Sequence, residues 1–72
     1  MTQFSVIIEM DEEGYVAHVP ALQGCYAQGD TYEEVFENIR DVIKLHLEDI
    51  MKSGQDIPKM QQISLTTVEI SV

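Results

Sequence analysis

The sequence predicts an α+β fold, in which a four-stranded sheet is covered on one face by a single helix. Three observations lead to this prediction. Apolar residues alternate with polar ones at residues 4–10 and 15–19, an apolar stripe with three- and four-residue spacing follows Thr31, and residues 63–72 are rich in β-branched side chains. The expected order of elements is β-β-β-α-β, within one domain that comprises residues 1–72.

The first two strands are expected to form a hairpin. Every second residue from Phe4 to Met10 is apolar, which is typical of a strand with one buried face, and Ile7 is a partial exception. Residues 11–14, DEEG, make a four-residue turn with glycine at its last position, and residues 15–19, YVAHV, resume the alternation. The two runs should therefore pair antiparallel.

A connection and a third strand follow the hairpin. Pro20 lacks a backbone donor, so residues 20–24, PALQG, are expected to connect two strands, and residues 25–28, CYAQ, to form a short third one. A right-handed crossover through the helix would then place residues 63–72 beside the first strand and parallel to it. The alternation in this segment shifts between Leu65 and Val68, so the sequence leaves two alternatives open, a bulge at this point or final residues that leave the sheet. The predicted sheet order is 3-2-1-4, with one face and both edges open for association.

The helix has start and stop signals in the sequence. Thr31 precedes Glu34 by three residues, a capping-box spacing in which the threonine hydroxyl accepts from a backbone amide of the first turn. Lys52 stands in the last turn, and Gly54 can close the helix in a left-handed conformation. The apolar stripe that should face the sheet consists of Val35, Ile39, Val42, Ile43, His46, Leu47 and Ile50.

The chain is strongly acidic, with 13 Asp and Glu residues against 4 Lys and Arg residues and a net charge of -9. No Lys or Arg precedes Arg40. Nucleic-acid binding needs basic side chains that neutralise phosphates, so direct binding of nucleic acid is not expected. The charge favours a basic protein partner instead.

Size and cysteine content favour self-association in a reducing compartment. A chain of 72 residues with one cysteine has neither disulfides nor a Cys/His metal cluster to stabilise it, so we expect a homodimer or a higher homo-oligomer. No apolar run reaches the roughly 18 residues of a membrane span, and the N-terminus lacks a signal-peptide layout. We therefore expect a cytoplasmic protein that does not contact a membrane.

The polar residues do not predict a catalytic, cofactor or metal site. Residues 24–35, GCYAQGDTYEEV, lack the glycine spacing of phosphate-binding loops, and a corner between a strand and a capped helix explains them better. Cys25, with His18 as its base, is a candidate nucleophile, but a cysteine among apolar strand residues is more often an inert core residue. The carboxylates of residues 11–13 lack the spacing of a calcium loop and fit a solvated turn.

A long stretch of the chain resembles a known family. Residues 10–39, MDEEGYVAHVPALQGCYAQGDTYEEVFENI, are similar to the HicB family of antitoxins, whose members share an acidic turn followed by Gly-Tyr-Val-Ala, Val-Pro-Ala-Leu, Gly-Cys, Gln-Gly-Asp-Thr, Glu-Glu and Asn-Ile. Two positions depart from the pattern: Gln23 stands where proline is common, and Val35 where alanine is usual. The resemblance implies a partial RNase H-like fold, which agrees with the order of elements derived above.

The resemblance also implies a function, the neutralisation of a small basic HicA-type toxin. Such a toxin is a ribonuclease related in fold to double-stranded-RNA-binding domains, and an acidic, non-catalytic domain would complement its cationic RNA-binding surface and cover its catalytic histidine. We expect Asp11, Glu12 and Glu13 to contact the partner, because a turn projects them together. Many family members add a DNA-binding segment, which is not expected here.

Two alternative functions use other features of the sequence. A stand-alone oligomeric scaffold or regulatory protein without a toxin would use the open sheet face and edges. A metal-dependent nuclease would need carboxylates from several elements around two metal ions, and the candidates are Glu9, Asp11 and either Glu34 or Asp41. The nuclease is the weakest of the three hypotheses, because Glu9 is the only acid inside the first three predicted strands.

Overall fold

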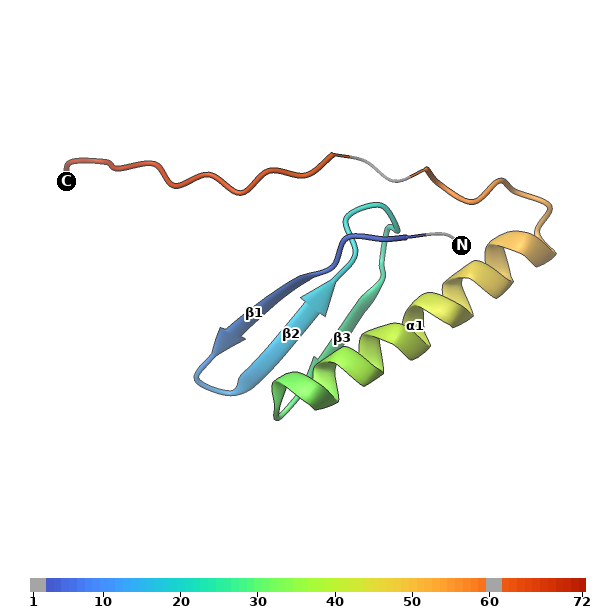
Figure 1. Ribbon diagram of the computed structural model, residues 1–72, viewed down its shortest axis with the longest axis horizontal. Helices are drawn as coiled ribbons and strands as arrows, with labels where there is room; N and C mark the ends of the chain where they lie inside the picture. The colour runs from blue at the N-terminus through green and yellow to red at the C-terminus, as the bar shows by residue number, and fades with distance from the viewer. Residues whose placement is uncertain (1–2, 60–61) are drawn as a thin grey trace.

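A computed structural model of the protein describes residues 3–59 and 62–72. Its elements are strands β1 (Ile7–Asp11), β2 (Gly14–His18) and β3 (Tyr26–Gly29), and helix α1 (Tyr32–Lys52) (Figure 1). The α+β class and the order β-β-β-α are therefore confirmed. The predicted polar connection after the helix includes residues 60–61, which lie outside the described residues.

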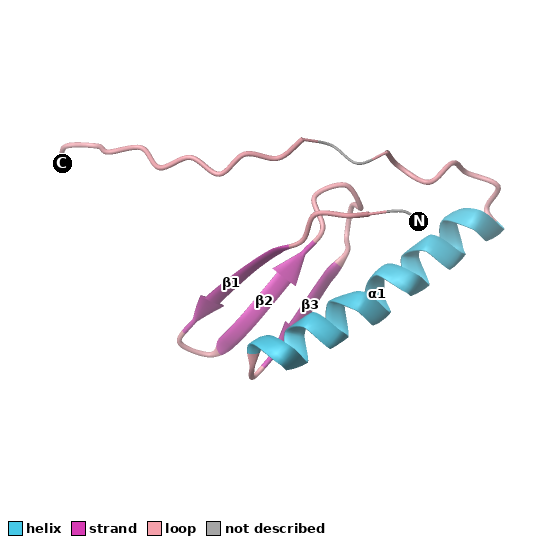
Figure 2. Ribbon diagram, in the orientation of Figure 1, coloured by secondary structure: helices cyan, strands magenta, loops and turns pink. Residues whose placement is uncertain are grey.

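The three strands form one antiparallel sheet in the order β1-β2-β3 (Figure 2). The register pairs Ile8 with Ala17 and Ala17 with Ala27, so these three residues share a face of the sheet. Because side chains alternate along a strand, their neighbours Ile7, His18 and Tyr26 lie on the other face. Helix α1 covers the face of Ala17 and leaves the face of His18 open.

The β1–β2 hairpin forms as the sequence predicts. An Oδ1 atom of Asp11 accepts hydrogen bonds from the backbone amides of Glu13, at 2.8 Å, and of Gly14, at 3.1 Å. This is the local hydrogen bonding by which aspartate stabilises a turn. Gly14 adopts a φ of 138°, and a Cβ atom at this position would lie 2.8 Å from the carbonyl oxygen of Gly29, so a glycine is required there.

The start and the end of α1 also follow the sequence signals. The Oγ1 atom of Thr31 accepts a hydrogen bond of 3.1 Å from the amide of Glu34, which is the predicted N-cap. At the other end Gly54 is left-handed, with a φ of 74°, and its amide donates to the carbonyl of Met51. Among the described residues, no helix combines the length and the apolar character that a bilayer crossing requires.

The hydrophobic core lies between α1 and the two strands nearest to it. It consists of Ala17, Val19, Leu22, Cys25, Ala27, Val35 and Ile39. The connection between β2 and β3 belongs to this core, because it turns back on itself through hydrogen bonds between Val19 and Cys25 and between Leu22 and Val19. From the predicted helical stripe, Val35 and Ile39 are fully buried, whereas Val42, Ile43 and Ile50 are half-buried at the margin of the core.

The predicted fourth strand is not part of this sheet, and the four-stranded sheet is corrected to a three-stranded one. Residues 62–72 contain no strand, and they run as an exposed segment separate from the sheet (Figure 2). The β-branched composition of residues 63–72 does favour an extended backbone, and the segment is extended. Composition does not choose a pairing partner, and within one chain the segment has not paired with β1.

Candidate protein-binding surface

A pocket lies at the end of the sheet where the β1–β2 turn meets the loop between β3 and α1. Its volume is about 310 Å³. It is lined by Asp11, Glu13, Gly14, Tyr15, Val16, Gln28, Gly29, Asp30 and Glu34. The pairing of β2 with β3, which sets Tyr15 opposite Gly29, brings these two distant parts of the chain together.

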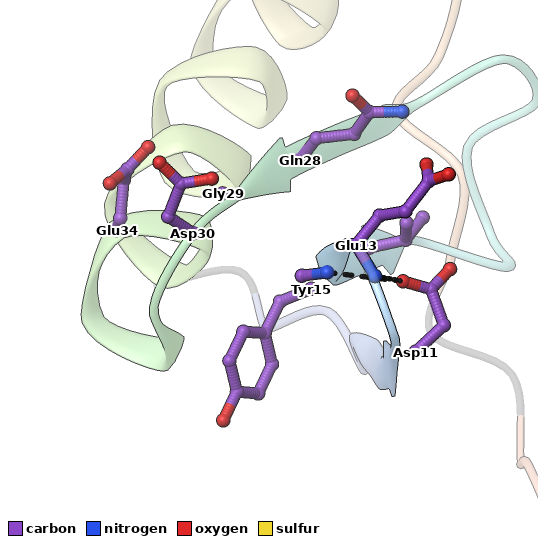
Figure 3. Close-up of a pocket in the computed structure, with 9 residues that line it drawn as sticks. Asp11, Glu13, Tyr15, Gln28, Gly29, Asp30 and Glu34 are labelled. Carbon is purple, nitrogen blue, oxygen red and sulfur yellow. Dashed lines mark hydrogen bonds between the residues drawn. The ribbon is translucent and has the colours of Figure 1, made fainter.

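The pocket is acidic on two sides. Figure 3 shows Asp30 and Glu34 on one side and Asp11 and Glu13 on the other, with Gln28 between them. Among the described residues that line the pocket, none carries a positive charge. Four carboxylates without an internal cation create a negative potential that attracts a cationic group from outside. Hereafter we call these four residues the acidic pocket.

The four carboxylates differ in how firmly they are held. Asp11 is fixed by the two backbone amides of its own turn, so one of its oxygens is already engaged. Asp30 directly precedes the N-cap Thr31, and Glu34 lies in the first helical turn, where the helix dipole stabilises negative charge. The pocket therefore places carboxylates at positions that the turn and the helix start stabilise, ready to accept hydrogen bonds from a partner.

An aromatic row runs from the pocket along α1. The rings of Tyr15 and Tyr32 meet edge to face with centroids 6.3 Å apart, and the ring of Phe36 stacks on Tyr32 at 6.4 Å. Tyr32 is 51% exposed and Phe36 is 44% exposed. Aromatic side chains that are rigid and yet accessible are typical of the centres of protein interfaces. We call Tyr15, Tyr32 and Phe36 the aromatic row.

The first Lys or Arg residue of the chain lies at the far end of the aromatic row. The guanidinium carbon of Arg40 is 6.0 Å from the ring centroid of Phe36, and an Arg40 nitrogen lies 4.0 Å from a carboxylate oxygen of Glu37. Both partners of this ion pair are exposed, so it adds little to stability. Arg40 therefore does not neutralise the negative charge of the acidic pocket.

The structure brings together part of the predicted contact set and adds to it. Asp11 and Glu13 line the pocket, whereas Glu12, at the exposed tip of the same turn, does not. Asp30 and Glu34 were not among the predicted contacts, although they complete the pocket. The signal that would have found them is the strand register, because a hairpin of residues 15–29 brings Gly29 next to Tyr15 and carries Asp30 with it.

The candidate nucleophile and its base are not brought together. Cys25 is 1% exposed, and burial raises the pKa of its thiol, which disfavours the reactive thiolate. His18 lies on the open face of the sheet, where its ring is 6.0 Å from that of Tyr26. The sheet therefore separates the imidazole from the buried core that contains the cysteine.

The carboxylates proposed for a nuclease are brought together only in part: Asp11 and Glu34 line the acidic pocket, whereas Glu9 and Asp41 do not. Glu9 pairs with Val16 on the open face of the sheet, whereas Asp41 belongs to the helix that covers the other face. Within residues 3–59 and 62–72, no three His, Cys, Asp or Glu side chains come close enough together to hold a metal ion. The geometry of this surface suits binding of a cationic partner through carboxylates and aromatic rings.

The sequence matches a known protein family over most of its length. A family model described as "HicB_like antitoxin of bacterial toxin-antitoxin system" matches residues 4–70. A UPF0150 protein of Synechocystis sp. is 53% identical over 63 residues, which cover 85% of this chain and 91% of that protein. A UPF0150 protein of Thermoplasma acidophilum is 43% identical over 58 residues, which cover 79% of this chain and 84% of the relative.

A solved structure shares the fold. A chain of a structure named "HicA3 and HicB3 toxin-antitoxin complex" matches with a TM-score of 0.64 at 25% sequence identity. The match covers 76% of this chain and 64% of the solved one, so this chain spans less than two thirds of the length of that neighbour. The similarity to known proteins therefore holds for the backbone arrangement as well as for the sequence.

Proposed function

The chain belongs to the HicB-like antitoxin family, and from this premise we propose that it neutralises a small basic toxin of the HicA type. In this proposal the chain is a binding protein, not an enzyme, and it covers the RNA-binding and catalytic surface of the toxin. A ribonuclease surface that binds phosphates must carry positive charge, and the present chain offers the opposite charge. The proposal also locates the protein in the cytoplasm, where such a toxin meets its RNA.

The acidic pocket is the observation that most directly supports the proposal. Its volume of about 310 Å³ is near the lower end of the range for ligand pockets, roughly 300–1,000 Å³, which suits one or two inserted side chains. An inserted Arg or Lys side chain would meet carboxylates on both sides, and charge-assisted hydrogen bonds of this kind are among the strongest in proteins. We infer that the pocket receives a basic side chain of the toxin.

The aromatic row would supply the apolar part of the same interface. Tyr15 lines the pocket and its ring contacts Tyr32, which stacks on Phe36, so a partner that covers the pocket would also extend over these rings. The faces of Tyr and Phe attract cations at close range, which adds to the carboxylate attraction. Water exclusion by the rings would strengthen the buried charge pairs.

The turn residues Asp11, Glu12 and Glu13 keep a role in this proposal. Asp11 and Glu13 would contact the partner inside the pocket, and Glu12, at the exposed tip, would mainly raise the association rate through its charge. The family resemblance further implies a partial RNase H-like arrangement. We propose this relationship for the three-stranded sheet and the helix as well.

A matched pair of double variants tests the proposal. Asp30→Asn with Glu34→Gln removes two charges from the pocket, and Asp41→Asn with Glu48→Gln removes two charges from exposed positions of α1 outside it. Both variants have the same net charge, so a difference between them reports position. Isothermal titration with a small basic toxin of the HicA type should show at least a tenfold weaker affinity for the pocket variant, equivalent to about 1.4 kcal/mol.

The control variant should lose less than about twofold, because exposed charges far from the contact act only through screened long-range attraction. Equal losses in both variants would show that net charge alone drives binding and would remove the pocket from the interface. Absence of any binding at micromolar concentration by the unmodified chain would contradict the antitoxin function itself and favour a scaffold without a toxin.

A further inference from the structure

The face of the sheet that α1 leaves open is more apolar than a solvated face usually is. In an antiparallel sheet with one face in water, apolar side chains point to the core and polar ones to the solvent. Here the strand register places two rows across the uncovered face, Ile7, His18 and Tyr26 in one and Glu9, Val16 and Gln28 in the other. We call these six residues the open face. Ile7 is the residue that breaks the alternation of the first strand, and the register shows that it belongs to this face.

The apolar side chains of the open face are accessible. Ile7 and Val16 are half-buried, and Tyr26 is 63% exposed. The ring of Tyr26 lies beside that of His18, with the centroids 6.0 Å apart. Strand β2 is held by β1 on one side and by β3 on the other, so these side chains project from a backbone that needs no ordering when a partner binds. Rigid, accessible tyrosines are frequent energetic centres of protein interfaces.

The open face is continuous with the acidic pocket. Val16 and Gln28 belong to both, because they are paired in the register and also line the pocket. Figure 3 shows Gln28 between the two acidic sides. The pocket admits only one or two side chains, whereas a specific interface takes about 800 Å² from each partner. A partner that fills the pocket therefore needs neighbouring surface as well, and the open face begins at the lining of the pocket.

The charge of this surface indicates which partner it fits. Glu9 lies on the open face, and Asp11, two residues later in β1, extends the same side of the strand to the pocket. No Lys or Arg precedes Arg40 in the sequence, so no such cation of the sheet opposes these carboxylates. Lys and Arg side chains lay their apolar stems along apolar surface while their charged ends reach polar groups. A basic protein can therefore cover Val16 and Tyr26 and meet the carboxylates with the same side chains.

The same charges disfavour a second copy of this chain as the occupant. A second copy would bring its own Glu9 and its own acidic pocket to this surface. Like charges that meet across an interface cost binding free energy. The open face is therefore matched to a partner of opposite charge.

We propose that the open face is part of the toxin-binding surface, and that the toxin extends from the acidic pocket across all three strands with Tyr26 as its principal contact. This inference rests on the proposed function, because its occupant is the basic toxin proposed above. It adds a surface to that proposal, since the aromatic row lies on the side of the sheet that α1 covers. In the complex, Ile7, Val16 and Tyr26 are covered, and basic groups of the toxin meet Glu9.

A matched pair of truncations gives the first test. Tyr26 is 63% exposed and Leu45, on α1, is 61% exposed, so Tyr26→Ala and Leu45→Ala each remove a large accessible apolar side chain from different places. In calorimetric titration with a small basic toxin of the HicA type, Tyr26→Ala should weaken binding at least about tenfold, as loss of a central tyrosine does. Leu45→Ala should weaken it by less than about twofold. Circular dichroism checks that both variants are folded.

The outcomes separate this inference from the proposed function. Equal affinities of Tyr26→Ala and Leu45→Ala for a toxin that the unmodified chain binds would overturn the open face as an interface and leave the antitoxin function intact. Absence of binding by the unmodified chain would overturn both.

A second test uses the unmodified chain and therefore does not depend on the folding of a variant. His18 lies on the open face and His46 on α1, and both are half-buried. Diethyl pyrocarbonate acylates accessible imidazoles, and mass spectrometry of peptides gives the rate at each histidine. Saturating toxin should slow the reaction at His18 at least about fivefold and at His46 by less than about twofold, because only the former lies inside the proposed contact.

Two results of this measurement would overturn the inference. One is a reaction at His18 that saturating toxin does not slow, or slows no more than at His46. The other is protection of His18 in the isolated chain that rises with its concentration, which would show that a second copy covers the open face.

Discussion

The N-terminal part of the chain, residues 1–39, and its C-terminal part, residues 40–72, are both rich in apolar residues but bury them to different extents. Among the residues that the structure describes, every buried core residue lies between Ala17 and Ile39. After Ile39 no described residue is buried, although the sequence there includes Leu45, Met51 and the apolar residues of the C-terminal segment. The difference teaches that an apolar pattern creates a core only where a second element is within reach to cover it.

The proximity of partners explains the difference. In the N-terminal part, each element is followed by the next after a short turn, so β1, β2, β3 and α1 pack on their sequence neighbours. The C-terminal segment is separated from β1 by the whole of the other three elements and by a polar connection. Local contacts form at a small cost in chain entropy, and distant ones cost more.

The largest expected effect comes from substituting one isoleucine in each part of the chain and comparing the losses of stability. Ile39 is 1% exposed and Ile70 is 73% exposed. Ile39→Ala should lower the free energy of unfolding by about 2–5 kcal/mol, since it leaves a cavity in the core. Ile70→Ala should change it by less than about 0.5 kcal/mol in dilute solution. Urea unfolding followed by circular dichroism at submicromolar protein measures both.

Ile39→Ala can unfold a chain of this size outright, so Ile39→Val serves as the milder companion, with an expected loss of about 0.5–1.5 kcal/mol. Raising the protein concentration should leave the loss at Ile39 unchanged. Equal losses at Ile39 and Ile70 in dilute solution would contradict the assigned burial.

A smaller effect is expected at Gly29, where β3 and α1 come close together. A Cβ atom at this position would lie 2.6 Å from the backbone nitrogen of Val35 and 2.9 Å from its Cα atom, and backbone cannot move aside cheaply. Gly29→Ala should therefore destabilise the fold by about 1–3 kcal/mol, as overpacking does. Gly24→Ala is the control, because Gly24 has a φ of 77° but no atom within 4 Å of the added carbon.

The control should cost about 1 kcal/mol through backbone strain alone. Thermal unfolding of the two variants side by side separates steric from conformational effects. A variant Gly29→Ala that is as stable as Gly24→Ala would show that the strand and the helix are farther apart than described.

Two threonines provide the third comparison, with an expected effect of about 1 kcal/mol. Thr31→Ala removes the hydroxyl that accepts from the amide of Glu34 at the helix start, and loss of an N-cap typically costs about 1 kcal/mol. Thr66→Ala changes an exposed residue of the C-terminal segment and should be neutral in dilute solution. Guanidinium unfolding measures both changes, and a neutral Thr31→Ala would exclude a capping contribution.

The smallest effect concerns pH. Burial holds the pKa of the Cys25 thiol above its ordinary value of 9.0. The unfolded chain therefore loses this proton before the folded chain does, and the stabilising contribution is complete below pH 9.0 and declines as the pH rises from there through the folded pKa. The stability difference between the unmodified chain and Cys25→Ala should narrow over that range, at most by about 1.4 kcal/mol per pH unit. A constant difference would show that the thiol is accessible to water.

Only part of the candidate binding surface was predicted from the sequence, because the rest depends on the register in which the strands pair. Asp11 and Glu13 belong to one local turn, so the sequence alone identified them as a cluster. Asp30 and Glu34 reach the same pocket through the pairing of Tyr15 with Gly29, a contact that turn chemistry does not specify. The aromatic row likewise joins Tyr15 of β2 to Tyr32 of α1 across the tertiary fold.

The sequence by itself determined the hairpin, the capped helix, the acidic character and the family. Each of these depends on residues close together in the chain or on composition, as with Thr31 and Glu34 at the helix start. The tertiary structure decided that the acidic pocket forms, that α1 covers β2 and β3 but leaves β1 open, and that residues 62–72 stay outside the sheet. Backbone propensity is a property of a segment, whereas pairing depends on which edge is free and within reach, and only the folded arrangement sets that.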